Sequence, residues 1–310
     1  MARTLPHRKG SIGRRPSEQV MKYLSASYAD STRDAYRSDV DHFIKWGGHL
    51  PSTARQVAEY LAAHGGKLAN STLARRLVAI NLAHRALRKM SPTTDQLVRA
   101  TLKGIFRKHR SIQRQVAPLL KDQIVRMVRG LRGVIGVRDS ALLLVGFAGA
   151  FRRSELVRIE VSDLDFVKQG VVIKLRYSKT DQEGKGRNVA IPYAQGAVCP
   201  VLALHRWIRV SGIQEGKVFR AVNRHGTISM VGMRPNIVGR VVKQRAAAVG
   251  LDPSQYAGHS LRAGLVTSAA KAGVSSWKIR QQTGHKSDAM VNRYIRDDQM
   301  FVDNAAARIL

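Results

Sequence analysis

The chain has 310 residues, of which 44% are hydrophobic and 24% are charged. At about 100 to 200 residues per domain, this length predicts two folded units, and the apolar share excludes a disordered polycation. The 53 Lys and Arg residues against 21 Asp and Glu give a formal net charge of +32. A field of this sign and size indicates a polyanionic partner, most commonly nucleic acid, although a basic ribosome-associated protein has the same composition.

Composition also limits the cofactors and the compartment. A single cysteine, Cys199, excludes an intramolecular disulfide and a cysteine-based zinc cluster. The sequence has neither a GxxxxGKS or GxxxxGKT phosphate loop nor a persuasive carboxylate cluster for two metal ions, so we expect no cofactor and no metal. No apolar run approaches the roughly 18 residues that span a membrane, and the first residues lack the hydrophobic stretch of a signal peptide. We expect a cytoplasmic protein with no membrane partner.

The N-terminal third predicts a basic arm followed by a helical domain. Residues 1–16 are basic and punctuated by Gly and Pro, which indicates a flexible arm. Over residues 17–108, apolar residues recur at three- and four-residue spacing, the pattern of packed helices. One helix is expected to be capped by Asn70, with an apolar face that runs from Leu73 to Leu87. Its other faces carry basic side chains that we expect to contact DNA phosphates rather than solvent alone: Arg75, Arg76, Arg85, Arg88 and Lys89.

A second domain follows a short linker. The apolar rhythm fails over residues 109–116, a basic and extended linker, and the second domain covers residues 117–310. The almost wholly apolar run Ala141–Phe151 is expected to be its core helix. The segments GVVIKLRYSKT and NVAIPY alternate around a glycine-containing turn, which predicts a β-hairpin with its loop near residues 179–186. From Pro200 onward the pattern predicts helices, so the expected fold class is mainly α with a small β-hairpin or sheet (α+β).

Four separated pieces of the second domain carry residues suited to handling one phosphodiester. They are FRRSEL at 151–156, SKT at 178–180, HSLR at 259–262 and GHKSDAMVNRY at 284–294. Attack on a phosphodiester builds negative charge on its non-bridging oxygens, and guanidinium groups offer paired donors that stay charged. In HSLR, His259 and Arg262 stand three apart, so one helical turn presents both to the same site. Each piece alone is weak, and the combination carries the argument.

The last piece requires a break in the helix. His285 and Tyr294 are nine residues apart, and at about 100° per residue a single helix would place them on opposite faces. Gly284 can stop one helix, and Ser287 can cap the next. We therefore expect two helices, with His285 between them and Tyr294 on the second.

In this order, the four pieces resemble the tyrosine recombinase family, also called the phage integrase family, which shares its active-site design with type IB topoisomerases. The resemblance covers the whole second domain, and the N-terminal helices look like the family's core-binding domain. It implies a phosphate clamp made by Arg152 and Arg262. Arg152 is preferred to Arg153 because the family places its first arginine three residues before a Glu-Leu pair, and Glu155 at that spacing can hold Arg152 in place.

The resemblance also implies the remaining roles. Tyr294 is the expected nucleophile, His259 accepts its proton or positions it, and His285 donates to a non-bridging oxygen. The family uses a lysine on the hairpin loop as the general acid that protonates the departing 5′ oxygen. Lys179 is our candidate for that lysine, and Lys185 in the same turn is its rival.

The implied reaction is a transesterification that leaves a 3′-phosphotyrosyl link and a free 5′ hydroxyl, with no need for ATP or metal. The expected function is site-specific recombination of double-stranded DNA that carries a specific recombination site. Family members act as a homotetramer on two DNA sites, and residues 296–310 are a candidate tail helix that docks on the next subunit or folds back on its own domain. A type IB topoisomerase and a catalytically silent DNA-binding relative are the alternatives. The helical N-terminal domain favours the recombinase, and the presence of all six expected residue types favours an active enzyme.

Overall fold

A computed structural model describes residues 17–110, 115–176, 186–196 and 198–295 of the chain. The chain divides into two compact units, Met1–Arg114 and Gln115–Leu310, and the division lies inside the 109–116 segment. The expected N-terminal arm and the C-terminal tail helix lie outside the described residues.

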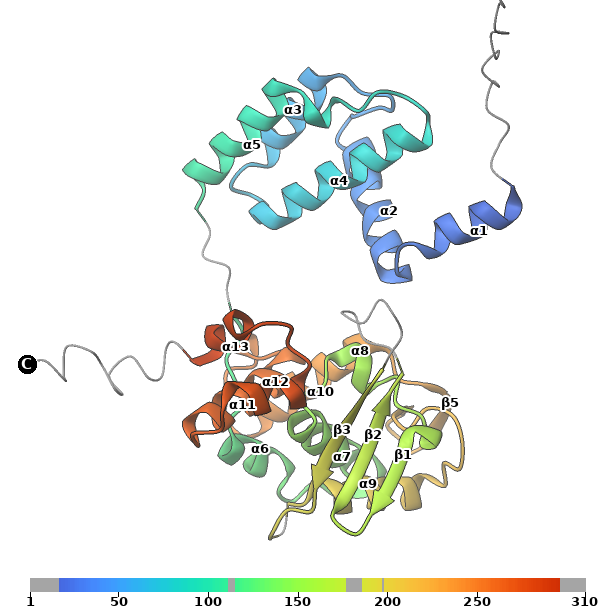
Figure 1. Cartoon of the computed structure of the whole chain (residues 1–310), viewed down its shortest axis with the longest axis vertical. Coiled ribbons are helices and arrows are strands. Elements are labelled where there is room, and N and C mark those ends of the chain that lie inside the picture. Colours follow the sequence, from blue (N-terminus) through green and yellow to red (C-terminus); the bar gives the residue numbers. More distant parts are fainter. Residues whose placement is uncertain (1–16, 111–114, 177–185, 197, 296–310) are drawn as a thin grey trace, which may run out of the picture. The chain divides into compact units, whose positions relative to one another are not determined.

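The described part of the first unit is helical. Its helices are α1 (Glu18–Ala26), α2 (Asp30–Lys45), α3 (Ala54–His64), α4 (Asn70–Ala86) and α5 (Gln96–Lys108), with a 3-10 turn at Pro92–Thr94 (Figure 1). Helix α2 packs against α4 and α3 packs against α5, around a core that includes the fully buried Phe43, Tyr60 and Leu73. Asp95 begins α5 as its N-cap, because its carboxylate accepts a hydrogen bond from the Leu97 N–H at 2.8 Å.

Helix α4 differs in detail from its prediction. Leu73 and Ile80 are fully buried, as expected, but the helix has ended before Leu87, whose side chain is 48% exposed. Asn70 is the first helical residue and not the N-cap. Its side-chain amide donates to the carbonyl oxygen of His109 at 2.9 Å, which ties the start of α4 to the end of α5.

The second unit combines helices with two small antiparallel sheets. Its helices are α6 (Lys121–Val128), α7 (Gly133–Ala148), α8 (Arg153–Leu156), α9 (Pro200–Ser211), α10 (Pro235–Ala248), α11 (His259–Lys271), α12 (Ser276–Thr283) and α13 (Asp288–Ile295). Its strands are β1 (Leu164–Val167), β2 (Gly170–Leu175), β3 (Arg187–Pro192), β4 (Arg220–Val222) and β5 (Ile228–Gly232), and 3-10 turns lie at Val161–Asp163 and Pro253–Gln255. Helix α7 is the expected core helix: it packs against α9 and α11 and is buried at almost every position from Gly136 to Gly146. It ends three residues before Phe151.

The hairpin prediction is confirmed. Strands β2 and β3 pair antiparallel, with Leu175 opposite Arg187 at the loop end, and β1 adds a third strand on the other side of β2. Val171 and Ile173 are buried while Lys174 is exposed, which is the alternation expected of a sheet covered on one face. Figure 1 shows this sheet beside α7 and α9.

The prediction that only helices follow Pro200 is wrong. Strands β4 and β5 pair antiparallel around a turn in which the Asn223 side-chain oxygen accepts hydrogen bonds from the N–H groups of His225 and Thr227, each at 2.9 Å. Both strands are short and only partly buried, so their apolar alternation is too weak to be read from the sequence. The fold class is nevertheless the expected one, mainly α with small β-sheets.

Candidate active site

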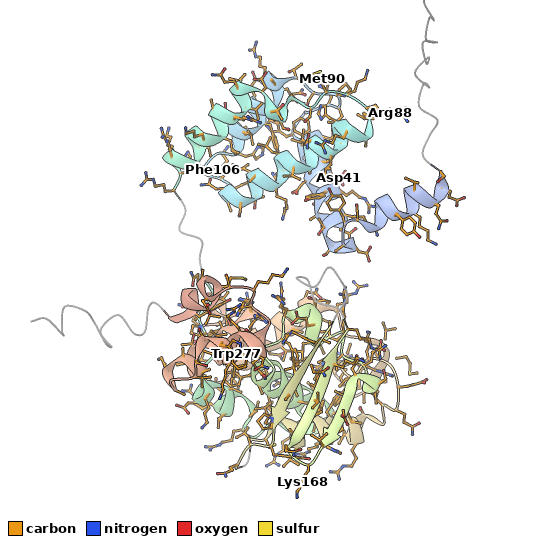
Figure 2. All side chains as sticks on the ribbon, in the orientation of Figure 1. Asp41, Arg88, Met90, Phe106, Lys168 and Trp277 are labelled. Carbon is orange, nitrogen blue, oxygen red and sulfur yellow. The ribbon has the colours of Figure 1, made fainter. Side chains whose placement is uncertain are left out.

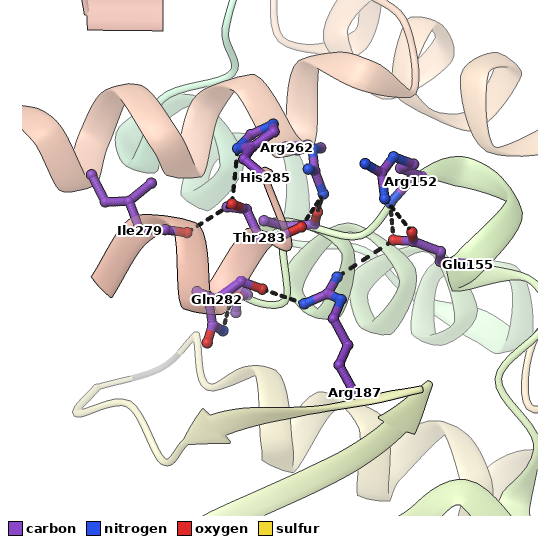
Figure 3. Close-up of polar contacts among 10 residues, drawn as sticks. Arg152, Glu155, Arg187, Arg262, Ile279, Gln282, Thr283 and His285 are labelled. Atoms are coloured by element: carbon purple, nitrogen blue, oxygen red, sulfur yellow. Dashed lines mark hydrogen bonds and ion pairs between the residues drawn. The ribbon is translucent and has the colours of Figure 1, made fainter. Parts of the chain in front are cut away.

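Arg152 and Glu155 form the first part of the site, at the start of α8. The Glu155 carboxylate accepts a hydrogen bond from Arg152 Nη1 at 2.6 Å and another from the Arg152 backbone N–H at 2.9 Å (Figure 3). The Glu155 side chain is only 2% exposed and that of Arg152 is 19% exposed. The expected pair at i, i+3 is thus a buried, charge-assisted contact that fixes Arg152 through both its side chain and its main chain.

Arg262, one turn into α11, lies in the interior with 1% of its surface exposed. Its Nη1 donates to the carbonyl oxygens of Ala150 at 2.8 Å and Thr283 at 2.7 Å. Ala150 has a left-handed backbone (φ 48°), an unfavourable conformation for alanine that turns its carbonyl toward the arginine. Burial, reinforced by the positive charge of Arg152, lowers the pKa of Arg262 to about 10, so it stays charged at neutral pH.

His259 and Tyr294 meet at the open edge of the site. The Tyr294 hydroxyl lies 2.7 Å from His259 Nε2, although the two residues are 35 positions apart in sequence. Loss of solvent around the imidazole, together with the charges of Arg262 and Arg152, lowers the pKa of His259. A neutral imidazole at hydrogen-bond distance from a phenol is suited to accept its proton.

His285 occupies a buried position between α12 and α13, with 7% of its surface exposed. Its Nδ1 lies 2.9 Å from the Thr283 hydroxyl oxygen, and that hydroxyl donates its own hydrogen to the carbonyl of Ile279 at 2.7 Å. The hydroxyl oxygen therefore accepts a hydrogen bond from Nδ1–H. In the neutral ring, the other nitrogen, Nε2, then carries no proton. Burial, followed by the charges of nearby Arg262 and Arg152, lowers the pKa of His285 to about 3.

The expected helix break is confirmed. Helix α12 stops at Gly284, whose left-handed backbone (φ 70°) suits the end of a helix, and α13 starts directly after Ser287. The Tyr294 ring packs beside a small apolar cluster formed by Val266, Ile279 and Val291. This cluster joins α11, α12 and α13 and holds the tyrosine next to His259.

Arg187 is a charged residue of this region that the sequence argument did not identify. Its Nη1 donates to the carbonyl of Gln282 at 2.6 Å, and its Nη2 lies 3.6 Å from a carboxylate oxygen of Glu155 (Figure 3). The side chain is 19% exposed, and burial lowers its pKa. The available signal was the strand alternation: Arg187, Val189 and Ile191 share the inward face of β3.

The comparison with protein families decides what this constellation belongs to. Residues 118–300, more than half of the chain, match the model described as "Phage integrase family". The chain belongs to the phage integrase family. The match covers every element that contributes to the site, from α8 to α13.

Individual relatives agree with this assignment to the phage integrase family. The chain is 37% identical over 306 residues to an "Integrase/recombinase xerD homolog" of Selenomonas ruminantium, covering 95% of this chain and 90% of that protein. It is 27% identical over 287 residues to "Tyrosine recombinase XerC" of Lactobacillus delbrueckii subsp. bulgaricus, covering 87% and 90%. The solved structure of the Tn1549 transposon integrase in complex with transposon right end DNA has the same fold, with a TM-score of 0.63 at 17% identity over 94% of this chain and 96% of that one. The protein is a tyrosine recombinase.

Five of the six side chains expected from the family resemblance come together in this recombinase: Arg152, His259, Arg262, His285 and Tyr294. The sixth, Lys179, and its rival Lys185 lie outside the described residues. The strands that flank their loop are described, and Arg187 at the start of β3 reaches the site.

The basic residues expected to meet DNA in the N-terminal unit fall into two groups. Arg85, Arg88 and Lys89 are exposed at and after the end of α4, where Figure 2 labels Arg88. Arg75 is half-exposed and pairs with Asp39 through two hydrogen bonds of 2.7 and 2.9 Å.

Arg76 differs from the expectation of an outward-facing side chain. It is 8% exposed, and its Nη1 donates to the Tyr60 hydroxyl at 2.8 Å and lies 2.9 Å from His42 Nδ1. Its Nε also lies 3.5 Å from the buried Asp39. These contacts place Arg76 inside the helical unit, where it links α2, α3 and α4.

In the described part of the chain, His, Cys, Asp and Glu side chains do not gather in groups of three or more that could hold a metal ion. Among the same residues, the helices are too short or too polar to cross a membrane.

Proposed function

We propose that this tyrosine recombinase cuts and rejoins double-stranded DNA at a specific site by a transesterification in which Tyr294 is the nucleophile. The observation that carries the proposal is the 2.7 Å separation between the Tyr294 hydroxyl and His259 Nε2, beside two arginines held by buried acceptors. A phenol, a proton acceptor and two fixed cations are what attack on a phosphodiester requires.

In the forward step, His259 Nε2 takes the Tyr294 proton as the phenol oxygen bonds to phosphorus. The bond from phosphorus to the 5′ oxygen breaks, which leaves a 3′-phosphotyrosyl link and a 5′ oxygen that takes up a proton. We propose Lys179 as the donor of that proton, with Lys185 as the alternative. Attack by a 5′ hydroxyl reverses the step, so the bond energy is conserved and neither ATP nor a metal ion takes part.

Arg152 and Arg262 stabilise the charge that develops on the non-bridging oxygens. Arg262 supports this role because its Nη2 is buried and has no hydrogen-bond partner among the described residues. A phosphate oxygen at that nitrogen would supply the missing acceptor. Glu155 keeps Arg152 beside it, with the carboxylate already committed to that arginine.

His285 adds a donor once the phosphate is present. In the DNA-free protein its pKa is about 3, so the ring is neutral, with its proton on the Nδ1 that Thr283 engages. Burial is the largest cause of this low pKa, and the charges of Arg262 and Arg152 lower it further; a phosphate between the two arginines offsets these charges and raises the pKa. We propose that His285 is then protonated and donates from Nε2 to a non-bridging oxygen.

The assembly and the DNA contacts are proposed on family grounds. We propose a homotetramer on two DNA sites that acts in the cytoplasm and uses the N-terminal helical unit as a core-binding domain. Arg75, Arg85, Arg88 and Lys89 are its proposed phosphate contacts, supported by their exposure and by the net charge of +32. The relatives named as recombinases, one of them 37% identical, support strand exchange over simple relaxation.

A covalent-trapping assay tests the chemistry. Wild-type protein and Tyr294→Phe are incubated in EDTA with nicked duplexes tiled over the DNA that flanks the gene, and the reactions are denatured in SDS. We expect a protein–DNA adduct from the wild type and none from the variant. Tight binding of that DNA by both proteins without any adduct would contradict the enzymatic function and leave a DNA-organising one.

A further inference from the structure

Arg187 lies where three segments of the catalytic unit meet. It is the first residue of β3, its Nη1 donates to the carbonyl of Gln282 near the end of α12, and its Nη2 lies 3.6 Å from a carboxylate oxygen of Glu155 in α8 (Figure 3). Each neighbour leads to a residue of the proposed site, because Glu155 holds Arg152 and Gln282 lies three residues before His285. The side chain of Arg187 therefore connects the Arg152–Glu155 pair with the turn that carries His285.

Close packing strengthens this link. A Cβ built on Gly284 would lie 2.9 Å from Nε of Arg187, so the guanidinium rests directly against the backbone of the turn that precedes His285. Gly284 has φ 70°, which glycine adopts without strain. A glycine here serves both the helix end and the approach of Arg187.

Holding a cation at this place is costly for the fold. Burial lowers the pKa of Arg187, and its Nε and Nη2 have no hydrogen-bond partner among the described residues. A buried donor that lacks an acceptor destabilises the folded state. Arg176, which follows the partner strand at the same loop end, shows the ordinary alternative, since it is half-exposed and paired with Asp163 at 2.6 Å. An arginine kept at such a cost is better explained by the geometry it maintains than by stability.

We infer that Arg187 is a positioning residue for the transesterification, which locks the Arg152–Glu155 pair and the His285 turn into one geometry. This inference rests on the proposed function. Arg187 acts through Glu155 and the α12 terminus and not on the leaving group, so its loss weakens charge stabilisation at the phosphate. Loss of an outer contact that orients a ligand at a metal site costs roughly 10- to 100-fold in activity, and we expect a loss of the same order here.

The test compares Arg187→Gln and Arg187→Lys with Arg176→Gln, a control that removes an arginine and its ion pair from the other side of the same hairpin end. Single-turnover adduct formation, DNA affinity and the thermal midpoint are measured for each. We expect Arg187→Gln to slow adduct formation by roughly 10- to 100-fold with DNA affinity within about twofold. Arg187→Lys, which can reach Glu155 or Gln282 but not both, should be intermediate, and Arg176→Gln should match the wild type.

A substrate with sulfur in place of the 5′ bridging oxygen separates positioning at the phosphate from help to the leaving group. Thiolate departs without a proton, so this substrate restores a variant that has lost only its general acid. We expect it not to restore Arg187→Gln. Restoration to the wild-type rate would overturn the inference, as would Arg187 variants that cleave within twofold of wild type.

The Arg187→Lys variant separates a loss of positioning from a loss of folding. If Arg187→Gln does not fold, a slower reaction of Arg187→Lys with an unchanged thermal midpoint supports the inference. A slower reaction that parallels a lower thermal midpoint or weaker DNA binding contradicts it. Failure of the proposed function gives a different result, because the wild type then forms no adduct on any substrate.

Discussion

At the scale of single residues, Arg262 and His285 share one arrangement. In each side chain one nitrogen is hydrogen-bonded within the protein and another can contact DNA. Arg262 donates from Nη1 to two carbonyl groups, and its Nη2 has no hydrogen-bond partner among the described residues. His285 donates a hydrogen bond from Nδ1 to Thr283, so its Nε2 can contact a ligand. Such anchoring fixes the orientation of both side chains before DNA arrives, so little reorganisation is needed when charge develops in the transition state.

The lowered pKa of His259 predicts how cleavage responds to acid. In the proposed step the Tyr294 proton passes to a neutral imidazole, and loss of solvent together with the charges of Arg262 and Arg152 holds the pKa of His259 below its ordinary value of 6.5. At sub-saturating DNA, where the rate reports the groups of the free protein, cleavage should stay level from pH 7.5 to about 6.5 and fall only in more acidic buffer. Single-turnover adduct formation across pH, with DNA affinity measured in parallel, checks this. A half-maximal rate at pH 6.5 or above would contradict it.

Thr283 should support both stability and rate. Thr283→Val keeps the shape of the side chain but removes the acceptor of the buried His285 Nδ1–H, so we expect urea unfolding to show a loss of about 1–3 kcal/mol. Adduct formation should slow by roughly tenfold or more, because the ring loses its orientation. Thr283→Ser keeps the hydroxyl and is the control. Equal stability of the Val variant and the wild type would remove the assigned role.

Which arginines lie inside could be predicted only in part. His259 and Arg262 share a turn because of their spacing, and Glu155 follows Arg152 at i, i+3, so local rules were sufficient for both pairs. Arg76 and Arg187 are held by contacts with residues far away in sequence. Strand alternation places Arg187 on the inward face of β3, but local periodicity does not identify the partners of either arginine.

At the scale of elements, the turn between α12 and α13 decides whether His285 and Tyr294 can share a site. The helix stop at Gly284 was predictable, because glycine readily adopts the left-handed backbone found there. The hairpin of β4 and β5 was not predictable, since its strands are short and half-exposed. Elements bounded by clear residue signals, such as a glycine at a helix end, can be predicted from sequence, whereas elements held mainly by tertiary packing cannot.

Two glycines with similar φ angles allow the effect of backbone strain to be measured separately from the effect of contact with Arg187. Gly284 and Gly273 have φ 70° and 73°, but only a Cβ at Gly284 would meet Arg187, while one at Gly273 would meet nothing within 4 Å. Gly284→Ala and Gly273→Ala should each lower unfolding free energy by about 1–2 kcal/mol from left-handed strain. Only Gly284→Ala should also slow adduct formation, by roughly tenfold or more. Equal rates for the two variants would show that contact with Arg187 is unimportant.

At the scale of the whole molecule, charge and fold divide the work. A net charge of +32 favours binding to DNA without regard to sequence, whereas the proposed chemistry depends on side chains of the second unit alone. The phage integrase match starts at residue 118 and therefore leaves the helical unit outside it. The 37% identical relative extends over both units, covering 95% of the chain.

The exposed basic residues at the end of α4 predict a salt effect. Replacing Arg85, Arg88 and Lys89 together by Gln should weaken DNA binding similarly for all sequences, because phosphate contacts carry no base information. The slope of log affinity against log salt should fall by roughly 0.9 for each phosphate that these side chains neutralise in the wild type. Titrations at several salt concentrations measure it, and the thermal midpoint should stay unchanged because these side chains are exposed. An unchanged slope would remove this surface from the DNA interface.

The most direct test of the central claim is to identify the atom that holds the DNA. Adduct formed by the wild-type protein is digested with nuclease and trypsin, and the modified peptide is sequenced by mass spectrometry. We predict a nucleotide joined through its 3′ phosphate to Tyr294, and a free 5′ hydroxyl on the released strand. Attachment to any other residue, or through a 5′ phosphate, would contradict the mechanism derived from the contact between His259 and Tyr294.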